Sequence, residues 1–207
     1  MRRQSSSTLL RGALHAIALF SVAAILSASP SARAAAPAQD STAAPSLEVA
    51  FSWNATRSNP ISGSSFWMQG GSFEVHGQFY RGLGAVADVA GAHTAGINSS
   101  GVGLDMVTAT FGPRYTWSLR NHKFRFFGQG LAGVANGFNS VFPSPNGANT
   151  SATSLALKAG GGMNISLTPH IALRAVQANW LRTAFPNSTT SAQNNLVLGA
   201  GIVIRLR

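Results

Sequence analysis

The chain has no cysteine and few charged side chains. Of its 207 residues, 15 are Lys or Arg and five are Asp or Glu, so charged residues make up 10% of the sequence. The absence of cysteine excludes disulfides, thiol catalysis and cysteine-ligated metals. A soluble domain ordinarily carries about 25% charged residues. The composition therefore favours a protein whose outer surface does not face water.

The basic residues are spread along the chain and form no cluster. A protein that binds nucleic acid usually concentrates its Lys and Arg on one face, so we expect no nucleic-acid partner. A dispersed positive charge is compatible with phosphate-rich lipid headgroups. The His, Asp and Glu residues show no spacing typical of a metal site, and we expect neither metal nor cofactor.

Residues 1–34 have the features of a secretory signal peptide. A basic start with Arg2 and Arg3 precedes the apolar run Ala13–Leu26, and Ala32-Arg33-Ala34 is an A-x-A cleavage site. The apolar run is too short for a transmembrane helix, which needs about 20 residues, although a retained helical anchor is the alternative. Cleavage would lower the net charge from +10 to +6, because four of the 15 basic residues lie before the cleavage site.

The mature chain begins with an Ala/Pro-rich segment, residues 35–45, which we expect to be a flexible tether. Residues 46–207 are then one domain. Its last segment, Asn195–Arg207, alternates strictly between two faces. The apolar parity holds Leu196, Leu198, Ala200, Ile202, Ile204 and Leu206, and the small or polar parity holds Val197, Gly199, Gly201, Val203 and Arg205. This period of two predicts a β-strand with one apolar face.

Seven alternating segments precede this strand. They are Leu47–Thr56, Gly71–Tyr80, Leu83–Gly91, Met106–Ser118, Lys123–Ala135, Ser154–Ser166 and Ile171–Leu181. The connections between them are alternately short and long, and the long ones are Arg57–Gly70, Ala92–Asp105, Asn136–Thr153 and Arg182–Gln193. Short turns at one end and long loops at the other are typical of outer-membrane barrels. We predict an all-β fold, an eight-stranded antiparallel up-and-down transmembrane β-barrel with both termini periplasmic and the long loops outside.

Two of the segments depart from simple alternation. In Ile171–Leu181, strict alternation would turn Gln177 and Asn179 towards lipid, so we predict a one-residue β-bulge near Ala175–Val176 that returns both to the lumen. In Lys123–Ala135, if Arg125 and Gln129 face inward, then Phe127 and Leu131 do so too.

Aromatic residues fall into two groups on this topology. One group converges near the periplasmic rim, namely Phe79, Tyr115, Trp117, Phe124 and Phe126. A second, with Trp53, Phe73 and Trp180, converges near the outer rim. Amphipathic rings favour both interfaces of a membrane.

Three stretches resemble the small OmpA/OmpX-like eight-stranded outer-membrane β-barrel family. They are Phe111–Tyr115, Leu155–Met163 with Pro169–Arg174, and the terminal strand. The resemblance covers Leu47–Arg207 and implies a non-catalytic protein of the bacterial outer membrane, with a role in envelope integrity, adhesion or a small pore. It also implies a C-terminal signal for the barrel-insertion machinery, matched by Gly199, Gly201, Ile204 and Leu206. Aliphatic residues replace the usual aromatics there, and Arg207 follows.

The charged residues of inward parity are the candidate functional residues. They are Glu48, Glu74, Asp88, Arg114, Lys158 and Arg174. An eight-stranded barrel is just wide enough for side chains to fill it. We therefore expect an ion-pair plug that ties opposite walls together; the alternative is a charged lumen that conducts ions or small solutes.

A lipid-modifying enzyme is a third, weaker hypothesis. It would need a nucleophile, a base and an orienting acid near the outer leaflet, and the best set is His93 with Thr94 and Asp88 or Asp105. His122 and His170 fall in short turns at the other end of the barrel. The residue two positions after His76 is Gln78, not the serine that the pattern of lipid A deacylases has there.

We expect a monomer with outer-membrane lipids as neighbours. An extracellular partner, not identified by the sequence, could bind through the loops. Phe138, Val141 and Phe142 in Asn136–Thr153 would contact such a partner or, as we expect, fold back on the rim. A soluble periplasmic barrel that turns its apolar face inward is the remaining alternative.

Overall fold

A computed structural model describes residues 46–61, 64–97, 102–119, 123–144, 147–186 and 192–206. The predicted signal peptide, the tether and Arg207 lie outside the described residues. Within those ranges, no helix is long and apolar enough to cross a membrane.

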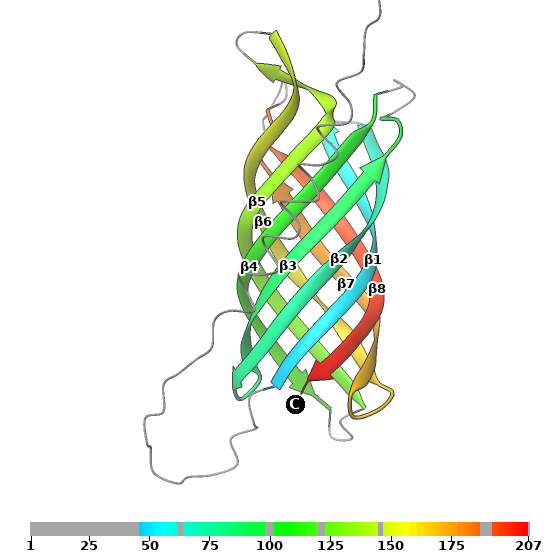
Figure 1. Ribbon diagram of the computed structural model, residues 1–207, viewed down its shortest axis with the longest axis vertical. Coiled ribbons are helices and arrows are strands. Elements are labelled where there is room, and N and C mark those ends of the chain that lie inside the picture. The colour runs from blue at the N-terminus through cyan, green and yellow to red at the C-terminus, as the bar shows by residue number, and fades with distance from the viewer. Residues whose placement is uncertain are drawn as a thin grey trace, which may run out of the picture. The chain divides into compact units, whose positions relative to one another are not determined.

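Eight antiparallel strands pair in chain order, and the last pairs with the first, so the sheet closes into a barrel (Figure 1). The strands are β1 (Ser46–Ile61), β2 (Ser64–Tyr80), β3 (Leu83–Thr94), β4 (Leu104–Ser118), β5 (Phe124–Ser144), β6 (Gly147–Ser166), β7 (Ile171–Thr183) and β8 (Gln193–Leu206). The predicted closed, eight-stranded antiparallel barrel is confirmed, and β8 closes it by pairing with β1.

The strands are longer than the sequence predicted. Two of the four predicted long loops were wrong, because most of their residues lie in strands. Much of Arg57–Gly70 belongs to β1 and β2, and much of Asn136–Thr153 belongs to β5 and β6. The prediction relied on the alternation of apolar and polar residues. This alternation is lost where a strand extends beyond the part of the barrel whose outer surface is apolar. The backbone ladder continues further because pairing needs only N–H and C=O groups.

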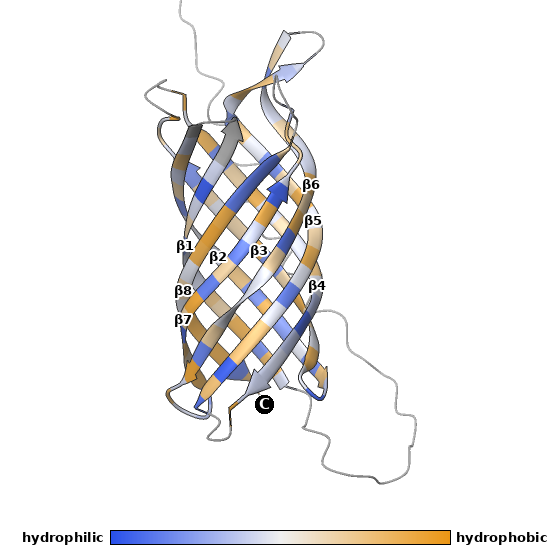
Figure 2. Cartoon of the chain, turned by 180° about the vertical axis from the view of Figure 1, so that it is seen from behind, coloured by the Kyte–Doolittle hydropathy of each residue, from blue (hydrophilic) through white to orange (hydrophobic). Residues whose placement is uncertain are grey.

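The two faces of the sheet are inverted relative to a soluble protein. On β4, Phe111 is 63% exposed on the outside of the barrel, whereas Arg114 is 2% exposed on the inside. Figure 2 shows the same alternation of apolar and polar residues along the strands. The barrel therefore has an apolar outer surface and a polar, filled interior.

The predicted bulge in β7 is confirmed. Arg174 pairs with Gly201 of β8 and Gln177 with Gly199, so the bulged strand carries one extra residue between them. The shift buries Gln177 and Asn179 in the lumen and leaves Trp180 on the outside. In β5, Phe127, Gln129 and Leu131 are all buried, as the conditional prediction required.

A two-residue turn, Arg81-Gly82, joins β2 to β3. Both residues have positive φ, 35° for Arg81 and 90° for Gly82, which is the requirement of a type I′ hairpin turn. A Cβ on Gly82 would overlap the carbonyl oxygen of Thr116, whose own N–H donates to the carbonyl of Gly82 at 2.7 Å.

We predict that Gly82→Ala destabilises the barrel by about 1–3 kcal/mol, because it adds a strained φ and a steric overlap. Urea titration of the barrel refolded in lipid vesicles, followed by tryptophan fluorescence, measures the change. Gly77→Ala on β2 is the control, because a Cβ there meets nothing within 4 Å. Equal unfolding midpoints for the two variants would contradict the strained-turn assignment.

Candidate functional site: the barrel lumen

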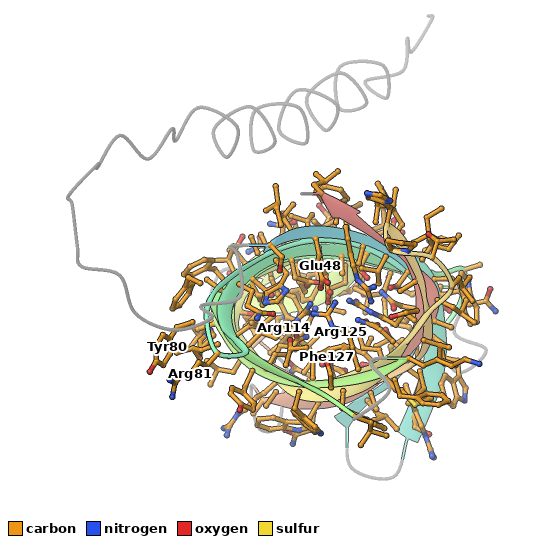
Figure 3. The ribbon with its side chains drawn as sticks, turned by 90° about the horizontal axis from the view of Figure 1, so that it is seen from below. Glu48, Tyr80, Arg81, Arg114, Arg125 and Phe127 are labelled. Atoms are coloured by element: carbon orange, nitrogen blue, oxygen red, sulfur yellow. The ribbon has the colours of Figure 1, made fainter. Side chains whose placement is uncertain are left out.

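All six charged residues singled out in the sequence are buried inside the barrel. Their exposed fractions are 4% for Glu48 and Lys158, 2% for Arg114 and 1% for Glu74, Asp88 and Arg174. Figure 3, a view along the barrel, shows Glu48, Arg114, Arg125 and Phe127 within the ring of strands. The structure divides the six residues among three groups, each built on one carboxylate.

The central group is built on Glu74 of β2. Its carboxylate accepts hydrogen bonds from Arg114 Nη2 at 2.7 Å, Arg174 Nη1 at 2.5 Å and Gln177 Nε2 at 2.9 Å. These donors come from β4 and β7, so one carboxylate ties three strands together across the lumen. Charge-assisted hydrogen bonds of this kind are the stronger ones in proteins.

Amide side chains extend the central group to two more strands. Arg114 Nε donates to Gln129 Oε1 at 2.8 Å, and Gln129 Nε2 donates to Asn179 Oδ1 at 3.2 Å. Arg174 Nε donates to Asn164 Oδ1 at 3.2 Å. The sequence marked Gln177 and Asn179 as inward residues through the bulge. It did not identify the amides as guanidinium acceptors, because partners from different strands have no fixed spacing in the chain.

Phe127 of β5 lies against both central guanidinium groups. The Cζ atoms of Arg114 and Arg174 are 4.4 and 4.8 Å from its ring centroid, within the range of cation–π contact. The ring occupies space opposite Gly162, where a Cβ would lie 2.8 Å from Phe127 Cζ. The same Cβ would overlap the backbone carbonyl oxygen of Val176 on β7, so close packing against both the neighbouring strand and the ring explains this glycine.

A second group surrounds Glu48 of β1. Arg125 of β5 and Arg205 of β8 donate to its Oε1, the latter at 3.2 Å from Nε. His76 Nδ1 lies 3.4 Å from the other carboxylate oxygen. Arg205 also donates to Ser166 Oγ of β6 at 3.0 Å. Arg125 and Arg205 were inward residues in the sequence, but only the fold shows that both serve the same acid.

The third group pairs Asp88 of β3 with Lys158 of β6, and Thr110 Oγ1 donates to the same carboxylate oxygen at 3.4 Å. A cavity of about 10 Å³ adjoins Lys158 and is lined by polar Asn54 and Thr108 and by apolar Leu181. That volume is close to the minimum for one water molecule, so this part of the lumen is nearly filled.

An apolar cluster fills the lumen towards the ends of the long hairpins. Its buried members are Phe66, Met68, Met106, Ala135, Phe142, Ala156, Leu181, Phe185 and Val197. The rings of Phe142 and Phe185 lie 5.6 Å apart, and Gly137 makes room for them, since a Cβ there would lie 2.8 Å from Phe142 Cζ. We call this cluster the apolar cap.

The sequence did not predict the apolar cap, because Phe66, Met68, Phe142 and Phe185 lie in segments treated as loops. Of the three apolar residues discussed there, Phe142 is buried, whereas Val141 is 60% exposed. The expectation that these side chains fold back on the rim is therefore confirmed for Phe142 and wrong for Val141.

Among the described residues, no serine or threonine hydroxyl is hydrogen-bonded to His93, so the part of the chain that the structure describes supplies no nucleophile for the enzyme hypothesis. His93 Nδ1 lies 2.5 Å from Asp105 Oδ1, and the other oxygen of Asp105 accepts from Asn139. Thr94 points to the opposite face of β3, as neighbours in a strand must; Asp88 is paired with Lys158 in the lumen. Over the described ranges, no group of three or more His, Cys, Asp or Glu residues could hold a metal ion; His122 lies outside them.

No family model and no curated protein matches the chain. Several solved structures are similar to the chain. The attachment invasion locus protein Ail of Yersinia pestis aligns with a TM-score of 0.53 and 16% identity, over 78% of this chain and 99% of that one. Neisserial surface protein A aligns with a TM-score of 0.58 and 12% identity, over 76% of this chain and 96% of that one. The chain has the fold of the small eight-stranded outer-membrane β-barrels.

In the terminal strand of this outer-membrane-type barrel, the four residues of the predicted insertion signal lie on two faces. Gly199 and Gly201 face the lumen, whereas Ile204 and Leu206 are 39% and 46% exposed on the outside. A Cβ on Gly201 would overlap the carbonyl oxygen of Phe51, so this glycine permits the close approach of β8 to β1.

We predict that Arg114→Ala lowers the free energy of unfolding by about 3 kcal/mol. Breaking a buried ion pair costs roughly 3–5 kcal/mol, and Arg174 still faces Glu74 in the variant. Urea titration and the heat-modifiable gel shift of the folded barrel are the measurements. The control is Arg182→Ala, an exposed arginine on the outer face of β7. Unchanged unfolding of Arg114→Ala would contradict a structural role for the central group.

Proposed function

We propose that the protein is a monomeric, non-enzymatic barrel of the bacterial outer membrane, with a structural or surface-interaction role. The observation that carries the proposal is the inversion of burial: large apolar side chains lie outside and ion pairs lie inside. A soluble barrel would gain nothing from this arrangement, because water would face its apolar surface. Hydrocarbon around the barrel accounts for it.

Exposed aromatic residues support the same placement. Tyr115, Trp117 and Phe126 stack near one end of the barrel, with ring centroids 6.1 and 6.0 Å apart. Towards the other end, Trp67 and Trp180 are 51% and 44% exposed. Two aromatic groups are typical of a barrel that spans two interfaces. We place the termini and short turns in the periplasm and the long hairpins outside, where they are free to bind a partner.

The contents of the lumen favour a closed barrel over the alternative, a narrow channel for ions or small solutes. Three carboxylates are each paired with at least one cation, and the apolar cap lies beyond them. An ion would have to break the pairs and then cross an apolar layer, where it has no hydration. The lumen groups therefore serve as a structural plug.

We expect the mature chain to stay insoluble without detergent and to fold when detergent or lipid vesicles are supplied. Solubility by ultracentrifugation and the heat-modifiable gel shift test this. The physical reason is the apolar band, which needs an apolar solvent. A monodisperse, folded protein in buffer alone would overturn the membrane placement and favour a soluble periplasmic barrel.

We expect no discrete openings when the purified barrel is reconstituted in planar bilayers. The matched comparison is a variant that opens both layers, Glu74→Ala and Arg114→Ala with Phe142→Ala and Phe185→Ala, for which we expect openings if it folds. Discrete openings of the unaltered barrel would overturn the closed lumen and establish the channel alternative.

A further inference from the structure

The outward face of β7, β8 and β1 carries a group of exposed donors near the loop-side ends of these strands. Its members are Arg57, Arg182 and Asn194. Arg182 pairs with Asn194 in the ladder, and Arg57 pairs with Leu196 two residues further along β8. Arg57 donates to Ser65 Oγ at 3.2 Å; Arg182 makes no side-chain hydrogen bond or ion pair with another described residue.

The two arginines flank β8 from opposite sides. Neighbouring strands lie about 4.8 Å apart and each residue rises about 3.4 Å, which puts the two Cα atoms roughly 12 Å apart on the sheet. Two extended arginine side chains can therefore serve one anionic headgroup from either side of Asn194. Arginine is the residue best suited to phosphate, because its planar fork donates two parallel hydrogen bonds.

No acid competes for these arginines on the same face. Among the described residues the acids are Glu48, Glu74 and Asp88, all in the lumen, and Asp105. Asp105 lies on β4, separated from β1 by two strands, and is engaged with His93 and Asn139. The exposed charge of β7, β8 and β1 in this region is thus uniformly positive.

Apolar surface lies directly beside and below the arginines. Arg57 has Trp67 as its partner on β2, and Trp180 lies across Leu196 on the other side. Four residues down β1 from Arg57, about 13 Å along the strand, Trp53 borders a shallow groove on the outer surface. The groove has a volume of about 540 Å³, and its lining includes Phe51, Trp53, Gly71, Phe73 and Val89.

We propose that this face binds a phosphorylated glycolipid with several acyl chains, the lipid A of the outer leaflet. Arg57, Arg182 and Asn194 hold the phosphorylated sugar headgroup, and acyl chains lie over Leu196 and Leu198 and in the groove beside Trp53. Donors spread over three strands fit a wide headgroup better than a single phosphodiester. The proposal rests on the proposed function, since it requires an outer-membrane location.

The test is native mass spectrometry of the full barrel in a non-ionic detergent, titrated with bis-phosphorylated lipid A or with dephosphorylated lipid A. We expect the apparent Kd for the bis-phosphorylated form to rise about tenfold for each arginine removed in Arg57→Gln and Arg182→Gln, as expected for the loss of a charge-assisted contact. Arg81→Gln, a matched change in the turn between β2 and β3, should leave the Kd unchanged.

A second pair of variants tests the groove. Gly91 is the neighbour of Gly71 in the ladder, and a Cβ there meets nothing within 4 Å, as at Gly77. Gly91→Leu should weaken lipid A binding several-fold by adding a side chain at the edge of the groove beside Gly71, and Gly77→Leu should not.

Equal binding of dephosphorylated lipid A or of phosphatidylglycerol, or an equal loss with Arg81→Gln, would overturn the assignment to lipid A. Equal behaviour of the two glycine variants would remove the groove from the site. A barrel that fails to fold in detergent would instead contradict the proposed function, so the two failures are distinguishable.

Discussion

The ladder between β1 and β8 is the contact on which the rest of the barrel depends. It runs from Leu47 opposite Leu206 to Asn59 opposite Asn194. Closure leaves no strand edge, which is the condition for a sheet to sit in hydrocarbon. Closure at eight strands also fixes a lumen just wide enough for side chains. Every inward residue must therefore share that space with residues from strands far away in the chain.

The polar groups of the lumen follow from this shared space. A carboxylate buried in a narrow barrel loses most of its contact with water, and Glu48, Glu74 and Asp88 each lie against cations from other strands. The central group engages five strands, and the Glu48 group engages β1, β2, β5, β6 and β8. Between them the three groups involve all eight strands of the barrel. They stabilise the cylinder against flattening or opening at any one seam.

Glycine is needed where an aromatic ring in the lumen lies against the backbone of the barrel wall. Gly162 makes room for Phe127, and Phe127 in turn packs against two guanidinium groups. Gly137 does the same for Phe142 in the apolar cap. The lumen thus changes character along its length, from ion pairs near Glu48 and Glu74 to an apolar layer under the long hairpins. The proposed closed lumen rests on this change in character, because an ion would lose hydration both among the ion pairs and in the apolar layer.

The sequence by itself determined the strand count, the side-chain directions in the clearly alternating strands and the bulge in β7, whereas the directions in β5 stayed conditional and those in the long hairpins were not predicted. Those features depend on a local period of two, which each strand displays in its own residues. The same alternation placed the side chains of Arg114 and Lys158 inside the barrel. Only the tertiary structure decided that Arg114 and Arg174 share Glu74 while Lys158 serves Asp88. It alone decided that Phe66 and Phe142 belong to one apolar cap. The reason is that pairing across a lumen depends on the register and stagger of strands distant in the chain, and no local pattern records these.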